Sequence, residues 1–286
     1  MNKKTLKVLE YYKIVEMLEE KTESQLGREL AKTIYPKTNI DEIKKMQNET
    51  EEALGLLIRK GNPPLYGIYD ISYELKMVDI GGVLSPGALL KISDSLRVTR
   101  NLKKYMKEIR EEEETKYPII NKLIDNLRVF KDIEEEINNA ILNENEISDN
   151  ASPRLRSIRR QIINKNQSIK DKLNSITSSD RYRKYLQDSI VTVRDGRYVV
   201  PIKQENKAYY PGIVHDQSSS GATLFVEPMA VVELNNELRE LELEERKEIE
   251  KILKELSQLV SYEGENISNN QKILQEIDFI FAKGKL

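Results

Sequence analysis

The chain has 286 residues, enough for one large domain or two ordinary ones, and 33% of them are charged while only 12 are glycine. It contains no cysteine and one histidine, which excludes disulfides, thiolate chemistry and most metal clusters. Because the sequence holds neither a run of about 18 apolar residues nor a signal-peptide pattern at its N-terminus, we expect a cytoplasmic protein that does not enter membranes.

Residues 1–151 are predicted to form a helical core, because apolar residues recur there at helical spacing. The expected helices are one over residues 6–18, one that ends before Pro36, one from Asn39 to Gly61, one from Ser85-Pro86 to Leu102, and shorter ones around Ile119–Leu127 and Ile133–Leu142. The polar stretch Asn143–Ser152 breaks this pattern and is the predicted boundary.

Two later segments carry narrow apolar seams with coiled-coil spacing. The first seam consists of Leu155, Ile158, Ile162, Ile169, Leu173 and Ile176. The second consists of Val231, Leu234, Leu238, Leu241, Ile249, Ile252, Leu256 and Leu259. Such seams predict that residues 152–189 hold an outgoing lever helix. Residues 229–286 would hold its antiparallel return, on the order of 50 Å long, and the start of a truncated core.

Between the two helices, residues 190–228 change to a β pattern. β-rich runs flank Arg194-Asp-Gly-Arg197, and Asp-Gly is a strong hairpin signal. A second pair of runs, Gly212–Asp216 and Ala222–Val226, flanks a serine-rich loop. The predicted fold class is therefore mainly α: a helical core plus a long antiparallel two-helix lever arm with a small β clamp at its tip.

The near-neutral net charge of −2 conceals an uneven distribution. Residues 1–151 contain 24 Lys and Arg residues and 28 Asp and Glu residues. Residues 152–210 are strongly basic, with 14 Lys and Arg against 5 Asp and Glu, whereas residues 211–286 are acidic, with 8 against 15. The basic lever helix has two interpretations: it pairs with the acidic return helix, or it binds phosphates. The interleaved Tyr182, Tyr185 and Tyr198 either stack on a ligand or pack internally.

For the tip, phosphate contact is the favoured interpretation, because its cations have few acidic neighbours in sequence. Arg194 and Arg197 bracket the predicted turn, where we expect no structural partner. The candidate nucleic-acid-binding residues are Arg154, Arg156, Arg159 and Arg160 on the helix, and Arg194, Arg197, Lys203, Lys207, Ser218, Ser219 and Ser220 at the tip.

No catalytic, cofactor or metal site is expected within this chain. It lacks the GxxxxGK[ST] and GxGxxG loops that cradle phosphates, so we expect no ATP binding. His215-Asp216 with the serines at 218–220 has the composition of a hydrolytic triad. Adjacent strand residues point to opposite faces, however, and no nucleophile elbow is evident, so hydrogen bonding within the loop is the favoured interpretation.

The segments Arg194–Lys203 and Gly212–Pro228 resemble the second bacterial MutS family, paralogues of mismatch-repair MutS that lack its mismatch-reading domain. The opening Lys4–Glu10 and the pair Asn235-Asn236 are similar as well. The resemblance covers the whole chain. It implies an N-terminal core, lever and clamp fragment of a homodimeric ATPase that uses ATP and Mg. Further domains, including a C-terminal nuclease-like one, would lie outside this stretch.

The same resemblance implies the partners, which are branched DNA or ribosomal RNA and the stalled ribosome. The implied functions are suppression of homologous recombination and the sensing and splitting of stalled or collided ribosomes. The alternative from the residues alone is a non-enzymatic coiled-coil module that binds another protein. Salt dependence separates the two, because nucleic-acid binding weakens steeply with salt.

Overall fold

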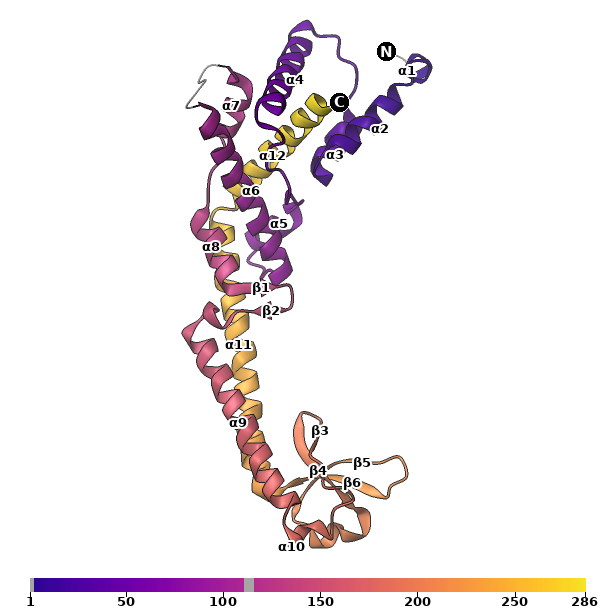
Figure 1. Ribbon diagram of the computed structural model, residues 1–286, viewed down its shortest axis with the longest axis vertical. Coiled ribbons are helices and arrows are strands. Elements are labelled where there is room, and N and C mark those ends of the chain that lie inside the picture. Colours follow the sequence, from indigo (N-terminus) through magenta and orange to yellow (C-terminus); the bar gives the residue numbers. More distant parts are fainter. Residues whose placement is uncertain (1–2, 111–115) are drawn as a thin grey trace. The chain divides into compact units, whose positions relative to one another are not determined.

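The computed structural model describes residues 3–110 and 116–286 (Figure 1). The fold is mainly α with small antiparallel sheets, as the sequence predicts. The chain divides into two compact units. We call Met1–Ser148 together with Ile252–Leu286 the body unit, and Asp149–Lys251 the arm unit.

The body unit is built from helices around α12 (Gly264–Lys285). The other helices are α1 (Lys3–Val8), α2 (Tyr11–Lys21), α3 (Gln25–Thr33), α4 (Ile40–Lys60), α5 (Ser72–Asp79), α6 (Pro86–Arg110), α7 (Pro118–Asp125), α8 (Lys131–Ala140) and the last residues of α11 (Val232–Tyr262). Leu274, Ile277 and Phe281 of α12 are buried with apolar residues of α4, α6 and α7. Ala282 packs with Leu18 of α2 and Ala31 of α3. Because α12 is apolar on several faces, it forms the centre of this unit.

Buried carboxylates cap two of these helices. Glu52 of α4 accepts hydrogen bonds from the backbone N–H groups of Ile119 and Ile120, which are free donors in the first turn of α7. Asp278 of α12 accepts from the backbone N–H groups of Glu23 and Ser24 at the start of α3, at 2.9 and 2.8 Å. These contacts link elements far apart in sequence and satisfy donors that would otherwise be buried unpaired.

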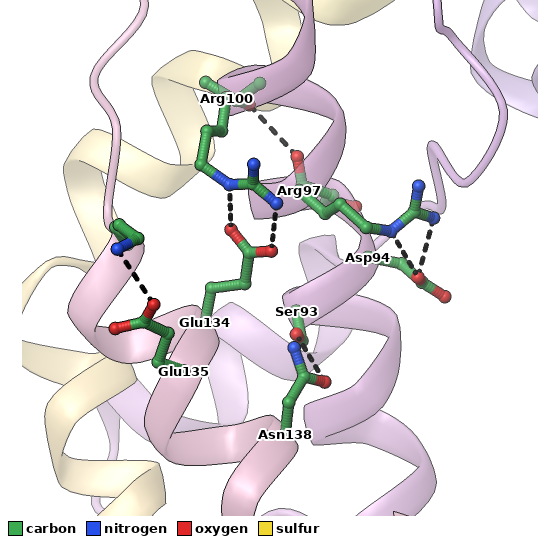
Figure 2. Close-up of polar contacts among 10 residues, drawn as sticks. Ser93, Asp94, Arg97, Arg100, Glu134, Glu135 and Asn138 are labelled. Carbon is green, nitrogen blue, oxygen red and sulfur yellow. Dashed lines mark hydrogen bonds and ion pairs between the residues drawn. The ribbon is translucent and has the colours of Figure 1, made fainter.

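Helices α6 and α8 are joined by an ion pair shown in Figure 2. The guanidinium of Arg100 donates two hydrogen bonds to the carboxylate of Glu134, at 2.8 and 2.9 Å. Nearby, the hydroxyl of Ser93 donates to the side-chain oxygen of Asn138 at 3.1 Å. A bidentate pair with a buried carboxylate fixes the packing of two helices more tightly than an exposed single contact would.

The body unit departs from the sequence prediction in three places. The helix expected over residues 6–18 is two helices, because Glu10 takes a left-handed conformation with φ of 51°. Helix α5 was not predicted. The hairpin of β1 (Ile141–Asn143) and β2 (Glu146–Ile147) replaces both the end of the last short helix and part of the polar boundary. Short elements such as these depend on packing rather than on local periodicity.

In the arm unit, α9 (Pro153–Thr177) runs antiparallel to the first part of α11 (Figure 1). The hydroxyl of Ser152 caps α9 by accepting a hydrogen bond from the N–H of Leu155. Ile169 and Leu173 of α9 are buried together with Val231 and Leu238 near the start of α11. The predicted antiparallel pairing is therefore confirmed for this part of the seam.

A four-stranded antiparallel sheet with strand order β3-β4-β6-β5 packs against these helices. The strands are β3 (Thr192–Arg194), β4 (Arg197–Lys203), β5 (Gly212–Gln217) and β6 (Thr223–Pro228). The short helix α10 (Asp180–Arg183) lies between α9 and β3 in the chain, and the 3₁₀ helix η2 (Gln204–Tyr209) links β4 to β5. Asp195 and Gly196 have φ of 49° and 74°, which is the two-residue turn expected for Asp-Gly. Both predicted hairpins are confirmed.

Candidate nucleic-acid interface

Three of the seven cations of α9 form ion pairs, each with at least one carboxylate of α11. The pairs are Arg154 with Glu244 (3.6 Å) and Glu248 (3.7 Å), Arg159 with Glu245 (2.7 Å) and Asp149 (2.5 Å), and Lys165 with Glu237. Arg156 donates to the side chain of Asn150, while Arg160 is exposed. The first of the two interpretations of the basic helix, pairing with its return helix, therefore applies to three of its cations.

The two arginines of the β3–β4 turn have structural partners, and the expectation that they would have none is wrong. The guanidinium of Arg194 lies 4.2 Å from the ring centre of Phe225, and its Nε is 3.0 Å from Asp216 Oδ2. Arg197 donates to both carboxylate oxygens of Glu227 (2.9 and 3.2 Å) and to Asn236 Oδ1 (2.7 Å). For Arg197 the strand order causes this, because β4 lies directly beside β6, which carries Glu227.

Glu227 is the centre of a buried polar network. Its side chain is 0% exposed, and it contacts Arg197, His215 Nε2 at 2.6 Å and Asn235 Nδ2 at 2.7 Å. A register shift in β5 between Val214 and Asp216 leaves His215 between paired positions, which changes the direction of its side chain. His215 is thus part of a structural network, and the favoured interpretation of the His-Asp-Ser segment agrees with this geometry.

The serine-rich loop bonds mainly within itself. The N–H of Ser218 donates to the carbonyl of Thr223, and Ser218 Oγ accepts from the N–H of Thr223 at 3.1 Å. Ser218 Oγ and Ser220 Oγ are 3.4 Å apart, and Ser219 and Ser220 are exposed. The loop therefore presents hydroxyl groups to solvent on a defined backbone.

Lys203 and Lys207, in contrast to the turn arginines, make no ion pair within the described part of the chain. Lys203 lies opposite Thr223 across β4 and β6, so it is next to the serine-rich loop. An open polar pocket of about 710 Å³ lies there, lined by Gln187, Lys203, Gln204, Glu205 and Ala222. The structure thus brings together Lys203 and the serine-rich loop, whereas Arg194 and Arg197 pair with residues of other strands of the sheet.

Three further exposed cations lie in the arm unit, at Arg181, Arg183 and Lys184. The sequence places them in the basic run but assigns them no role, because nothing local shows which segment they face. Across residues 3–110 and 116–286, no group of three His, Cys, Asp or Glu side chains is arranged to hold a metal ion. In the same ranges, no helix has the length and apolarity needed to cross a membrane.

The arm unit thus consists of two antiparallel helices that carry a four-stranded sheet. No protein-family model matches the chain. Over its whole length the chain is 52% identical to Endonuclease MutS2 of Alkaliphilus oremlandii (strain OhILAs) and of Clostridioides difficile (strain 630), and 50% identical to that of Alkaliphilus metalliredigens (strain QYMF). It spans 36% of the length of each of these relatives. The chain thus belongs to the second bacterial MutS family and corresponds to about a third of such a protein.

Proposed function

We propose that this chain is the lever-and-clamp module with which a MutS2 protein grips nucleic acid. The observation that carries the proposal is a pair of lysines at the tip that are not neutralised. Within the described part of the chain neither Lys203 nor Lys207 forms an ion pair, and Lys203 lies next to the exposed hydroxyl groups of the serine-rich loop. Phosphate groups are bound by such combinations of cations, hydroxyls and backbone N–H groups.

The relatives supply the biological context. They are named endonucleases, and that name implies a nucleic-acid substrate for those proteins. For the whole protein we propose a homodimeric ATPase that uses ATP and Mg bound outside this stretch. We propose branched DNA or ribosomal RNA in stalled ribosomes as its partners, with roles in suppressing recombination and rescuing ribosomes.

The packing of the arm unit supports a mechanical role. Two helices with a buried seam and cross-helix ion pairs resist bending better than one helix does. A displacement imposed on α11 or α9 would therefore reach the sheet with little loss, and the lever would transmit movement from the ATPase to the clamp.

The test is a titration of the 286-residue chain with fluorescently labelled duplex DNA at several salt concentrations. Lys203→Glu with Lys207→Glu should weaken binding and reduce the slope of log K against log salt by about 2, one unit per lost phosphate contact. The matched control is Lys91→Glu with Lys104→Glu on α6, which changes the net charge equally through exposed residues of the body unit.

Unchanged affinity and slope in the Lys203/Lys207 variant would contradict the proposal. So would an equal loss in the control, because the effect would then come from net charge alone. Binding that does not respond to salt would favour the alternative, a module that binds another protein through apolar contacts. Repeating the titration with four-way DNA junctions and with ribosomal RNA compares the proposed partners.

A further inference from the structure

Two aromatic pairs hold the α10 segment against η2. The rings of Tyr182 and Tyr210 meet edge to face, with centres 5.6 Å apart and planes at 70°. The rings of Tyr185 and Tyr209 are stacked, with centres 6.2 Å apart and planes only 12° from parallel. The backbone supports the same arrangement, since the N–H of Lys203 donates to the carbonyl of Tyr185. Side chains from residues 181–187 and 203–210 therefore share one surface.

The two pairs differ in what they contribute to folding. Tyr210 is 4% exposed and belongs to the apolar core of the arm unit, with Tyr182 packed against it. Tyr209 is 68% exposed although one face of its ring lies against Tyr185. The other face of the Tyr209 ring is consequently open to solvent. Such an exposed ring stabilises the fold little, and it offers a flat apolar surface to a ligand.

Cations lie close in sequence to this stacked pair. Arg181, Arg183 and Lys184 are exposed, and Lys184 Nζ lies 4.9 Å from the ring centre of Tyr185. Residues 181–187 and 203–210 together hold five Lys and Arg residues against one acidic residue, Glu205, with Asp180 and Asp188 at their edges. A polyanion that binds these segments would therefore meet net positive charge.

An open tyrosine face beside cations is the chemistry that binds unpaired nucleotides. Bases stack on aromatic rings regardless of sequence, while the backbone phosphates contact the neighbouring cations. Bases within a continuous duplex are stacked on one another and cannot reach such a ring. We propose that Tyr209, stacked on Tyr185, is a binding surface for unpaired bases of DNA or RNA, with Arg183, Lys184 and Lys207 contacting the adjoining phosphates.

This inference rests on the proposed function but is tested separately from it. The probes are fluorescently labelled single strands of 20 thymidine or 20 uridine nucleotides and a 20-base-pair DNA duplex, titrated against the 286-residue chain. Tyr209→Ala should weaken single-strand binding about tenfold, on the basis of one lost stacking contact, and leave duplex binding unchanged. Tyr209→Phe should retain single-strand binding, because it keeps the ring face.

Tyr262→Ala is the matched control, since Tyr262 is another highly exposed tyrosine but lies in the body unit. It should leave binding of all three probes unchanged. The inference is overturned if Tyr209→Ala binds single strands as tightly as the parent does, or if it loses the same affinity for single strands and for the duplex. The proposed function is contradicted by a different result, namely that Lys203→Glu with Lys207→Glu leaves the affinity for the duplex unchanged. The thymidine and uridine arms distinguish DNA from RNA as the preferred source of unpaired bases.

Discussion

At the scale of single residues, the carboxylate of Glu227 has the strongest structural role in the arm unit. A fully buried carboxylate is tolerated only with a counter-charge and hydrogen bonds, and Arg197 and Asn235 supply both. Arg197 is therefore the counter-ion of a buried group rather than a free cation at the turn. Reversing the charge of Arg197 is therefore expected to destabilise the arm unit, whether or not this residue also contacts a ligand.

Arg197→Glu should lower the free energy of unfolding by about 3–5 kcal/mol, because it places a second carboxylate beside a buried one. Lys207→Glu, an equal charge change at an exposed residue, should stay within about 0.5 kcal/mol of the parent. Urea denaturation followed by circular dichroism measures both. Overlapping curves for the two variants would show that the Arg197–Glu227 pair contributes little.

Asp278 gives a residue-scale prediction about pH. Burial raises the pKa of its carboxyl above the ordinary 3.8, against the hydrogen bonds from Glu23 and Ser24 and the charge of Lys285, which lower it. The folded state therefore binds this proton more tightly than the unfolded state does. Its contribution to stability is largest below pH 3.8 and falls as the pH rises through the raised pKa.

The unfolding free energy of the parent minus that of Asp278→Asn should accordingly decrease with rising pH above 3.8. Asp70 is a control whose pKa is shifted in the opposite direction, since hydrogen bonds from Ser72 hold the pKa of Asp70 below 3.8. For Asp70→Asn the same difference should decrease as the pH falls below 3.8. Urea unfolding across this range measures both slopes, and slopes of the same sign would be inconsistent with the argument.

At the scale of elements, the α9–α11 pairing depends on a seam that covers only part of each predicted run. Ile169 and Leu173 are fully buried, and Leu238 faces them from α11. Three residues of the predicted second seam behave differently. Ile252 and Leu256 are buried but belong to the body unit, and Leu259 is 38% exposed while Val260 is buried in its place.

Leu173→Asp should destabilise the arm unit by about 3–5 kcal/mol, because an aspartate at this position would be buried without a partner. Ile163→Asp is the control on the same helix, since Ile163 is 67% exposed and the new charge there remains hydrated. Thermal unfolding monitored at a helical circular dichroism wavelength separates the two. A parent-like melting curve for Leu173→Asp would contradict the buried seam.

At the scale of the whole molecule, the two units have separate apolar cores. The body unit has its cores around α12, and the arm unit has another between α9, α11 and the sheet. Helix α11 contributes residues to both units. Units with separate cores unfold as separate cooperative transitions unless a strong coupling joins them.

Calorimetry should therefore resolve two transitions. Leu173→Asp should lower the temperature of one of them, and Leu256→Asp, whose residue belongs to the body unit, should lower the other. Each variant is the control for the other, because both change one buried leucine to aspartate but in different units. A single transition that both variants shift equally would mean that α11 couples the units into one cooperative fold.

Local features of the sequence determined most of the secondary structure. Helical periodicity located α4, α6 and α9, and Ser152 and Asn39 marked helix starts that the structure confirms. Asp195-Gly196 specified the first hairpin of the sheet. In each case the interacting residues are close in the chain, so propensity and spacing contain the information.

Only the tertiary structure decided which cations are free. Arg197 meets Glu227, 30 residues away, and Arg159 meets Glu245, 86 residues away, so neither pairing is visible in the local sequence. The same holds for the stacking of Tyr185 on Tyr209 and for the capping of α7 by Glu52. Charge composition shows how many cations a segment has, but burial and strand order determine which of them are neutralised.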